Sequence, residues 1–180
     1  MFDLIIRGDQ VVTPQGTGAW DICVTGETIA AVASPGTFDS SQAGQVIDAT
    51  GKIIIPGGID PHIHSLWHIP PLEEGGEVSW TDGPDVVSKA AIHGGTTTLL
   101  DFANWQQSGT LEEVINIRKQ DWSGNCYADY GYHVMLQGAI PPEILPQIGE
   151  VIQEGYPSIK IFTTDITPSR RGRKITHGHI

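Results

Sequence analysis

The feature that most constrains the fold is an alternation of strand-like and helix-like segments after Lys52. Apolar runs typical of buried strands occur at 53–55, 96–102, 128–136 and 157–162. Segments with a helical spacing of apolar residues lie between them, at 83–93, 110–119 and 141–155. Strands that alternate with helices in this way predict a parallel sheet whose connections are right-handed crossovers.

Two parallel-sheet architectures fit this alternation. An open sheet of the dinucleotide-binding type would carry a Gly-x-Gly-x-x-Gly segment after a strand, and none of these strands is followed by one. Four strands instead fit half of a (β/α)₈ barrel, which needs roughly 250 residues when complete. The sequence therefore predicts an α/β chain in which residues 53–180 form the first half of a TIM-like barrel.

The first 52 residues have a different rhythm. Short β-rich runs are separated by turn signals such as Gly8-Asp9 and Pro35-Gly36, and they lie at 4–6, 10–12, 19–24, 28–32 and 45–47. They predict a small antiparallel sheet, part of a β-sandwich. We therefore expect a β-rich accessory domain at 1–52 and an incomplete barrel at 53–180.

Composition limits the partners and the compartment. The formal charge of −11 at pH 7 argues against nucleic acid, because phosphate binding needs a basic surface. No stretch approaches the roughly eighteen apolar residues that cross a bilayer, and no secretory signal is visible, so we expect a soluble, cytoplasmic protein that does not bind membranes. Cys23 and Cys126 lie in separate strand-like runs and are expected to be reduced core residues.

Residues 57–64, Gly-Gly-Ile-Asp-Pro-His-Ile-His, directly follow the apolar run at 53–55. On a strand, the i, i+2 spacing directs Asp60, His62 and His64 to one face. Two neutral imidazoles held in this way form half a site for a divalent ion such as zinc, and a nearby carboxylate can orient a ring through its other nitrogen. An exposed His-x-His in a loop is the alternative, and the preceding strand and Gly-Gly turn favour the metal site.

Two segments resemble a known family. Residues 56–64, Pro-Gly-Gly-Ile-Asp-Pro-His-x-His, and residues 94–102, Gly-Gly-Thr-Thr-Thr-Leu-Leu-Asp-Phe, are similar to the cyclic amidohydrolases, closest to hydantoinases and dihydropyrimidinases. Dihydroorotases and allantoinases share the His-x-His but usually continue differently from the Ser-Leu-Trp-His-Ile-Pro at 65–70. This departure favours the hydantoinase branch.

The resemblance implies a hydrolase that opens a cyclic amide or ureide, of hydantoin or dihydropyrimidine type, with a hydroxide that bridges two divalent metals. Zinc is the expected ion, and manganese or cobalt would also fit. The chain would be the N-terminal half of such an enzyme and inactive alone, with further histidine ligands and the general-base aspartate expected beyond Ile180. The complete form is expected to be a homo-oligomer, either a tetramer or a dimer.

Lys160 lies in the run at 157–162, where Ile159 and Ile161 alternate with it. The residues alone fit a strand-end lysine that reaches solvent. Desolvation lowers the pKa of an amine, and a neutral amine can react with carbon dioxide to give a carbamate whose two oxygens bridge two cations. The resemblance, carried here by Gly-x-x-Ser-x-Lys-x-Phe at 155–162, implies this metal-ligand role for Lys160.

Three residues are candidates for the substrate loop. Trp67 and His68 follow the first predicted barrel strand, in a loop that borders the substrate ring in the enzymes that this chain resembles, although they could equally be packing residues. Asp165 stands where those enzymes usually carry a tyrosine whose hydroxyl stabilises the tetrahedral oxyanion, and a carboxylate there would repel that charge.

Two other interpretations stay open. A non-catalytic relative could keep the fold as a scaffold after losing its metals, which Asp165 allows and which His62, His64 and Lys160 argue against. A truncated chain could also serve only as an interaction fragment. The remaining candidates are interpreted as structural or incidental: Asp101, His93, His133, His177 and His179.

Overall fold

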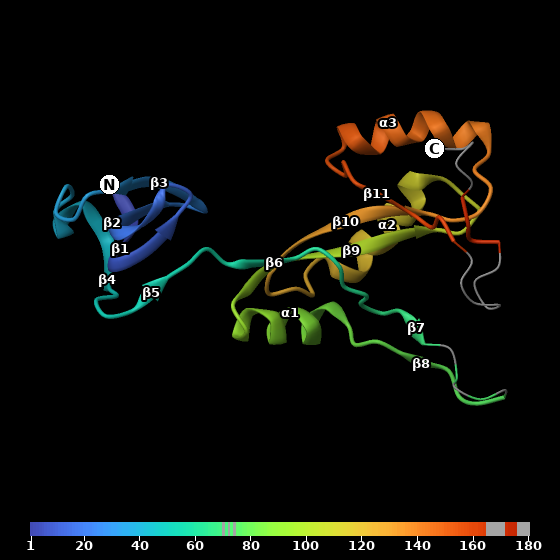
Figure 1. Cartoon of the computed structure of the whole chain (residues 1–180), viewed down its shortest axis with the longest axis horizontal. Coiled ribbons are helices and arrows are strands. Elements are labelled where there is room, and N and C mark those ends of the chain that lie inside the picture. Colours follow the sequence, from blue (N-terminus) through green and yellow to red (C-terminus); the bar gives the residue numbers. More distant parts are fainter. Residues whose placement is uncertain (70, 72, 74, 165–171, 176–180) are drawn as a thin grey trace. The chain divides into compact units, whose positions relative to one another are not determined.

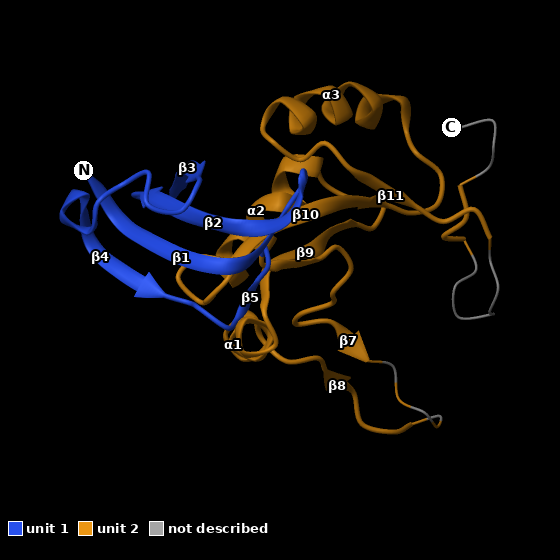
Figure 2. Cartoon of the chain, turned by 60° about the vertical axis from the view of Figure 1, so that its left-hand side comes forward, with its two compact units in different colours: residues 1–56 blue, residues 57–180 orange. Residues whose placement is uncertain are grey.

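The computed structural model describes residues 1–69, 71, 73, 75–164 and 172–175 (Figure 1). The chain divides into two compact units, Met1–Pro56 and Gly57–Ile180 (Figure 2). Within the described residues, no helix is long and apolar enough to cross a bilayer.

The N-terminal unit is a five-stranded sheet. Its strands are β1 (Phe2–Thr13), β2 (Gly16–Thr25), β3 (Thr28–Ala33), β4 (Ala43–Asp48) and β5 (Ile53–Ile54), and a 3₁₀ turn, η1 (Ser40–Gln42), precedes β4. The order is β3-β2-β1-β4, and β5 also pairs with β1. Because β4 and β5 run parallel to β1, the sheet is mixed, which corrects the prediction of an antiparallel sheet. Local strand and turn signals do not specify the direction of such non-local pairs.

The run at 53–55 also pairs differently from the prediction that it opens the barrel. Ile53 and Ile54 pair with Gln10 and Val11 of β1 in the first unit. The sheet of the second unit begins instead at β6 (Gly58–Asp60). An apolar run predicts a strand without identifying its partner, and here the partner is β1.

The second unit is built on four parallel strands. They are β6, β9 (Thr96–Trp105), β10 (Asp129–Leu136) and β11 (Ile159–Ile161), and their order in space follows their order in the chain. The helices of the connections are α1 (Pro84–His93), α2 (Leu111–Trp122) and α3 (Leu145–Gln153), the last preceded by the 3₁₀ turn η2 (Pro142–Ile144). A short antiparallel pair, β7 (His68–Ile69) and β8 (Ser79–Trp80), lies between β6 and α1. The α/β class is as predicted.

Helix α2 begins at a capping box of the Thr-x-x-Glu type. The Thr110 hydroxyl accepts a hydrogen bond of 3.1 Å from the Glu113 backbone N–H, and the Glu113 carboxylate accepts one of 2.8 Å from the Thr110 N–H. Two of the N–H groups that a helix start leaves unpaired are satisfied in this way. The helix starts at Leu111, and its buried residues then lie against β9 and β10.

The two sides of the parallel sheet have different neighbours. On the helix-facing side, alternate strand residues join α2, η2 and α3 in one core, which includes Leu99, Ala103, Trp105, Tyr132, Val134, Leu136, Ile115, Trp122, Ile144 and Val151. Ile159 and Ile161 of β11 pack against this core, so Lys160 between them points to the other side. That other, cavity-facing side carries Phe102, Met135 and Lys160.

Candidate functional site

His62 and His64 lie just beyond β6, in a segment that is not itself a strand. The Asp60 carboxylate accepts a hydrogen bond of 3.0 Å from the His62 backbone N–H. The two imidazole rings converge, and their Nε2 atoms are 3.3 Å apart. The i, i+2 spacing therefore brings two ring nitrogens together. Asp60, the last residue of β6, holds the backbone of the first histidine through its side chain.

Phe102 of β9 is the common neighbour of the predicted metal ligands. Its ring is only 2% exposed, and its centroid lies 4.7 Å from that of the His62 ring and 5.0 Å from that of the His64 ring. The Lys160 ammonium lies 5.0 Å from the same centroid and 5.5 Å from the Phe162 ring. His62 and His64, which follow β6, and Lys160 of β11 thus gather around one buried aromatic ring of β9.

A cavity of about 930 Å³ adjoins these residues. Cavities of roughly 300–1,000 Å³ with apolar walls and a few polar groups are typical of small-molecule sites. The lining residues are His62, His64, Leu66, Trp67, His68, Ile69, Trp80, Thr81, Phe102, Asn104, Gln106, Val114, Ile117, Arg118, Met135, Lys160, Phe162 and Arg173. Both candidate substrate-loop residues that the structure describes are among them.

Trp67 and His68 take different positions in this lining. The Trp67 ring lies 4.2 Å from the His64 ring, and its backbone N–H donates a 2.8 Å hydrogen bond to the Thr81 hydroxyl. The His68 ring lies 5.6 Å from the Trp80 ring, in the β7–β8 pair. Trp67 is therefore a direct neighbour of the histidine pair, whereas His68 packs on Trp80 within the β7–β8 pair to which it belongs.

The surroundings of His64 favour its neutral form. His64 is exposed, but partial desolvation of its ring lowers its pKa below the ordinary value of 6.5; the nearby His62 lowers the pKa further, while Asp101 raises it. A neutral imidazole keeps a lone pair on one ring nitrogen, which is the form that binds a metal. At neutral pH, His64 is therefore suited to act as a ligand.

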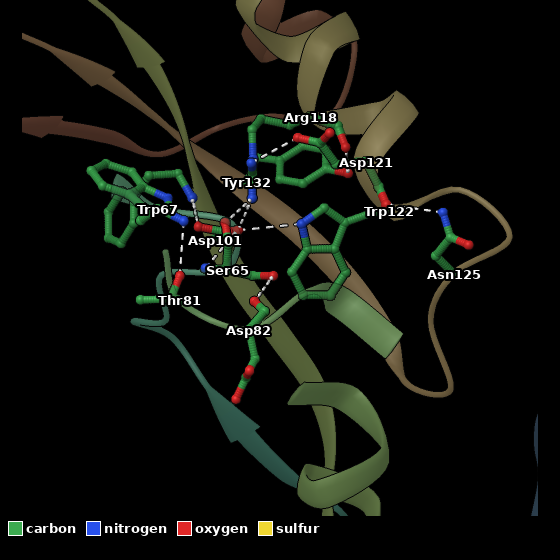
Figure 3. A network of polar contacts seen from close by, with 11 residues as sticks. Ser65, Trp67, Thr81, Asp82, Asp101, Arg118, Asp121, Trp122, Asn125 and Tyr132 are labelled. Carbon is green, nitrogen blue, oxygen red and sulfur yellow. Dashed lines mark hydrogen bonds and ion pairs between the residues drawn. The ribbon is translucent and has the colours of Figure 1, made fainter. Parts of the chain in front are cut away.

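A buried polar network surrounds Ser65, the residue after His64 (Figure 3). Asp101 of β9 is fully buried and forms an ion pair with Arg118 of α2. The Asp101 carboxylate also accepts hydrogen bonds from the Trp122 indole at 3.2 Å and from the Ser65 backbone N–H at 3.4 Å. Arg118 in turn donates a 2.9 Å hydrogen bond to the Ser65 carbonyl oxygen.

Sequence reasoning found Asp101 as a structural residue but missed Arg118. On α2 the buried residues are Leu111, Ile115, Arg118 and Trp122, which share one helical stripe. An arginine within an apolar stripe indicates a buried charge with a partner, because such a charge is costly to bury alone. That signal could have identified Arg118 before the structure.

Other titratable candidates lie outside the cavity or outside the described residues. His93 is exposed at the end of α1. The two ring nitrogens of His133 lie 2.6 Å from the Ser158 hydroxyl and 2.8 Å from the Pro61 carbonyl oxygen, so His133 ties β10 to the segment before His62. Asp165, His177 and His179 fall outside the residues that the structure describes.

The geometry of the histidine pair fits a divalent ion. Zinc–nitrogen bonds of about 2.0–2.1 Å at tetrahedral angles place two ligand nitrogens about 3.3 Å apart. The His62 and His64 Nε2 atoms have this separation, which would also allow a hydrogen bond between the rings. Among the described residues, His, Cys, Asp and Glu side chains form no group of three or more that could hold a metal.

Known proteins are similar to this chain over most of its length, although no family model matches it. A D-hydantoinase of Streptomyces coelicolor is 34% identical over 160 residues, which are 88% of this chain and 33% of that protein. A dihydropyrimidinase of Rattus norvegicus is 32% identical over 137 residues, 74% of this chain and 25% of that protein. An allantoinase of Salmonella paratyphi B is 33% identical over 162 residues, 89% of this chain and 32% of that protein.

Solved structures are also similar to this chain over nearly its whole length. The structure of a dihydropyrimidinase from Brevibacillus agri matches with a TM-score of 0.79 and 31% identity, over 99% of this chain and 36% of that one. The chain thus spans about a third of the length of the proteins that it matches.

Proposed function

We propose that this chain, which is related by sequence and by fold to the hydantoinases and dihydropyrimidinases, is part of a metal-dependent hydrolase that opens a cyclic amide or ureide. The observation that carries the proposal is the pair of histidine Nε2 atoms 3.3 Å apart, beside a cavity that Lys160 also lines. Because the chain spans about a third of its relatives, we assign the activity to the whole protein and expect these 180 residues alone to be inactive.

The proposed metal ligands are His62, His64 and Lys160. The two histidines would bind through Nε2, and the Asp60 carboxylate would fix the backbone that carries them. The Lys160 ammonium lies over aromatic rings, and no ion pair joins it to an acidic side chain in the described ranges. In its neutral form this amine would add to the carbon of carbon dioxide and lose a proton, and the resulting carbamate oxygens would be the ligand atoms.

When bound, two divalent ions, zinc by expectation, would supply a hydroxide nucleophile at neutral pH and polarise the substrate carbonyl. The residues of this chain would shape the space for the ring. Trp67, Phe102 and Met135 give the cavity apolar walls that exclude water, and His68 would contact the substrate further along the lining. Hydrolysis would break the ring C–N bond, with the water oxygen bonding to the carbonyl carbon and one proton going to the leaving nitrogen; the carboxylic acid formed would release its own proton to solvent and become a carboxylate.

The order of the strands supports a proposal about the architecture of the whole protein. The strands β6, β9, β10 and β11 follow each other in space as they do in sequence, with helices in the connections. This is the arrangement of consecutive strands in a (β/α)₈ barrel, whose active sites lie at the carboxyl ends of the strands. We propose that the second unit is the first half of such a barrel and that the first unit is part of a β-sandwich.

The proposed substrates are cyclic amides and ureides, and experiment identifies which ring is opened. Hydantoinase, dihydropyrimidinase and allantoinase are the names of the relatives, so similarity over this third of the chain does not separate their rings. Hydantoin, dihydrouracil and allantoin form the test panel. A homo-oligomeric enzyme is proposed on the same resemblance, and the cytoplasmic location stays a prediction from the sequence.

The test uses the protein expressed at its natural length. We expect about two zinc, manganese or cobalt ions per chain, together with opening of at least one ring of the panel. His62→Ala should lose both the metal and the activity. His93→Ala is the matched control, because His93 is exposed on α1 and lies outside the cavity lining; it should retain both.

A folded protein that contains no metal and opens none of the three rings would refute the enzymatic proposal. The non-catalytic scaffold would then be the better interpretation. If His62→Ala and His93→Ala lost metal and activity equally, His62 would no longer be assigned to the site.

A further inference from the structure

We propose that the buried ion pair between Asp101 and Arg118 positions His64 for metal binding by holding the backbone of Ser65. This inference rests on the proposed metal-ligand role of His64. Neither residue would be a ligand: both would act through the peptide groups that follow the histidine, so we class them as positioning residues.

Both backbone polar groups of Ser65 are held by the pair. Its N–H donates to Asp101 at 3.4 Å, and its carbonyl oxygen accepts from Arg118 at 2.9 Å. Ser65 itself is fully buried, and its hydroxyl donates a 2.9 Å hydrogen bond to the Asp82 carbonyl oxygen. Ser65 is therefore held at two backbone atoms, by β9 and α2, and at its hydroxyl, by the segment before α1 (Figure 3).

The next residue shows why such fixing is needed. Leu66 has a backbone φ of 54°, in the left-handed region that residues other than glycine rarely occupy. A residue in this region persists only where its surroundings hold it. The Leu66 N–H donates a 3.1 Å hydrogen bond to the Asp82 carbonyl oxygen, the same acceptor that Ser65 uses. The turn that leads away from His64 is thus strained and firmly held.

The ion pair is poorly suited to a purely stabilising role. Removing two charges from water is costly, and apolar residues of similar size often serve stability as well or better. The Arg118 Nε is buried without a hydrogen-bond partner among the described residues, which adds to that cost. What an apolar pair could not supply is the donor that reaches the Ser65 carbonyl oxygen together with the acceptor that reaches its N–H.

The experiment measures zinc affinity by competition with a chelator, in the absence of substrate, on the natural-length protein. The main variant is the double substitution Asp101→Asn with Arg118→Met, which removes both charges and leaves no unpaired buried ion. We expect its zinc affinity to fall by about 10–100-fold, the usual effect of losing groups that orient a metal ligand. A merely structural pair would change the melting temperature of the metal-free protein but not the zinc affinity of the folded protein.

Asp121→Asn is the matched control. It removes the other partner of Arg118, a 2.8 Å contact to a partly exposed carboxylate that does not reach Ser65. Zinc affinity should stay within about threefold of the wild type, because exposed ion pairs contribute little.

Arg118→Lys is the second test variant if the double variant does not fold. It keeps a positive charge beside Asp101, but its ammonium ends one bond short of the Arg118 Nη2 that donates to both Asp101 and Ser65, so affinity should again fall at least threefold.

The outcomes separate this inference from the proposed function. If the wild type takes up no zinc, the proposed function fails and this inference fails with it. If the wild type binds zinc and His62→Ala does not, while the folded double variant or Arg118→Lys binds within threefold of the wild type, only the positioning role is refuted. A decrease as large in Asp121→Asn as in the double variant would also refute it.

Discussion

The helix-facing and cavity-facing sides of the parallel sheet are made by alternate residues of the same strands, yet they have opposite characters. Leu99, Ala103 and Leu136 pack into the core with α2 and α3. Phe102 and Lys160, from the same sheet, line the cavity beside the histidine pair. Because side chains alternate along a strand, one backbone can carry both the packing that stabilises the fold and the residues that line the proposed site. Substitutions at adjacent positions should separate the two functions.

The largest expected effect on stability comes from adjacent residues of β10. Leu136 and Met135 are each 1% exposed, but Leu136 belongs to the core whereas Met135 lines the cavity. Leu136→Ala should lower the free energy of unfolding by about 2–5 kcal/mol. Met135→Ala should cost less, because one side of Met135 already faces open space. Urea unfolding of the metal-free protein measures both, and an equal or larger loss in Met135→Ala would contradict the contrast.

Two lysines allow the same comparison for activity. The Lys160 ammonium lies over Phe102 on the cavity-facing side, and the Lys119 ammonium lies 5.4 Å from the Tyr156 ring beside the core. Lys160→Met should reduce ring opening by about a hundredfold or more and lower the metal content, because it removes the proposed bridging ligand. Lys119→Met should leave turnover and metal content near wild type. Similar activities of the two variants would remove Lys160 from the site.

A smaller effect is expected at the start of α2. Thr110→Ala removes the hydroxyl that accepts from the Glu113 N–H, and it should cost about 1 kcal/mol of unfolding free energy. The zinc affinity of the folded protein should not change, because the cap is far along α2 from Arg118. Thermal melting and chelator competition on the same sample give both values. A loss of affinity without a loss of stability would show that the cap and the site are coupled.

The smallest effect concerns pH and the metal-free protein. Because partial desolvation lowers the pKa of His64, the unfolded chain takes up a proton on this residue at a higher pH than the folded chain. The free energy of unfolding should therefore fall as the pH decreases from about 6.5 towards the lower folded value, and should be unaffected by His64 above this range. His64→Asn, which cannot titrate, should show a shallower decrease in urea unfolding between pH 7 and pH 5. Identical slopes would contradict the neutral form of His64.

The elements of the second unit could be predicted from sequence because their signals are local. Thr110 and Glu113 form the capping box that begins α2, and α1 and α2 each begin one residue after the start of the segments predicted at 83–93 and 110–119. The first unit shows the limit of such signals. Gly8 and Asp9 read as a turn, but β1 continues through them with a shift in its pairing register to β2.

The candidate site also has one part that the sequence predicts and another part that it does not. The convergence of His62 with His64 and the placement of Lys160 opposite Ile159 and Ile161 follow from the period of two along an extended chain. The contacts that hold the histidine segment do not follow from any local pattern. The Asp101–Arg118 pair joins residues 17 positions apart, and the contact of His133 with Pro61 spans 72 positions. Only the tertiary fold brings these groups together, which is why sequence reasoning found the candidate ligands and missed Arg118.

The sequential order of β6, β9, β10 and β11 has a consequence for synthesis on the ribosome. Each new strand finds its partner in the strand made just before it, so the sheet can grow at one edge as the chain emerges. By the time Leu136 has left the exit tunnel, Ser65, Asp101 and Arg118 are all available to one another. Lys160 arrives only with the next strand. The segment carrying the two histidines can therefore be shaped first, and the lysine is added to a surface that already exists.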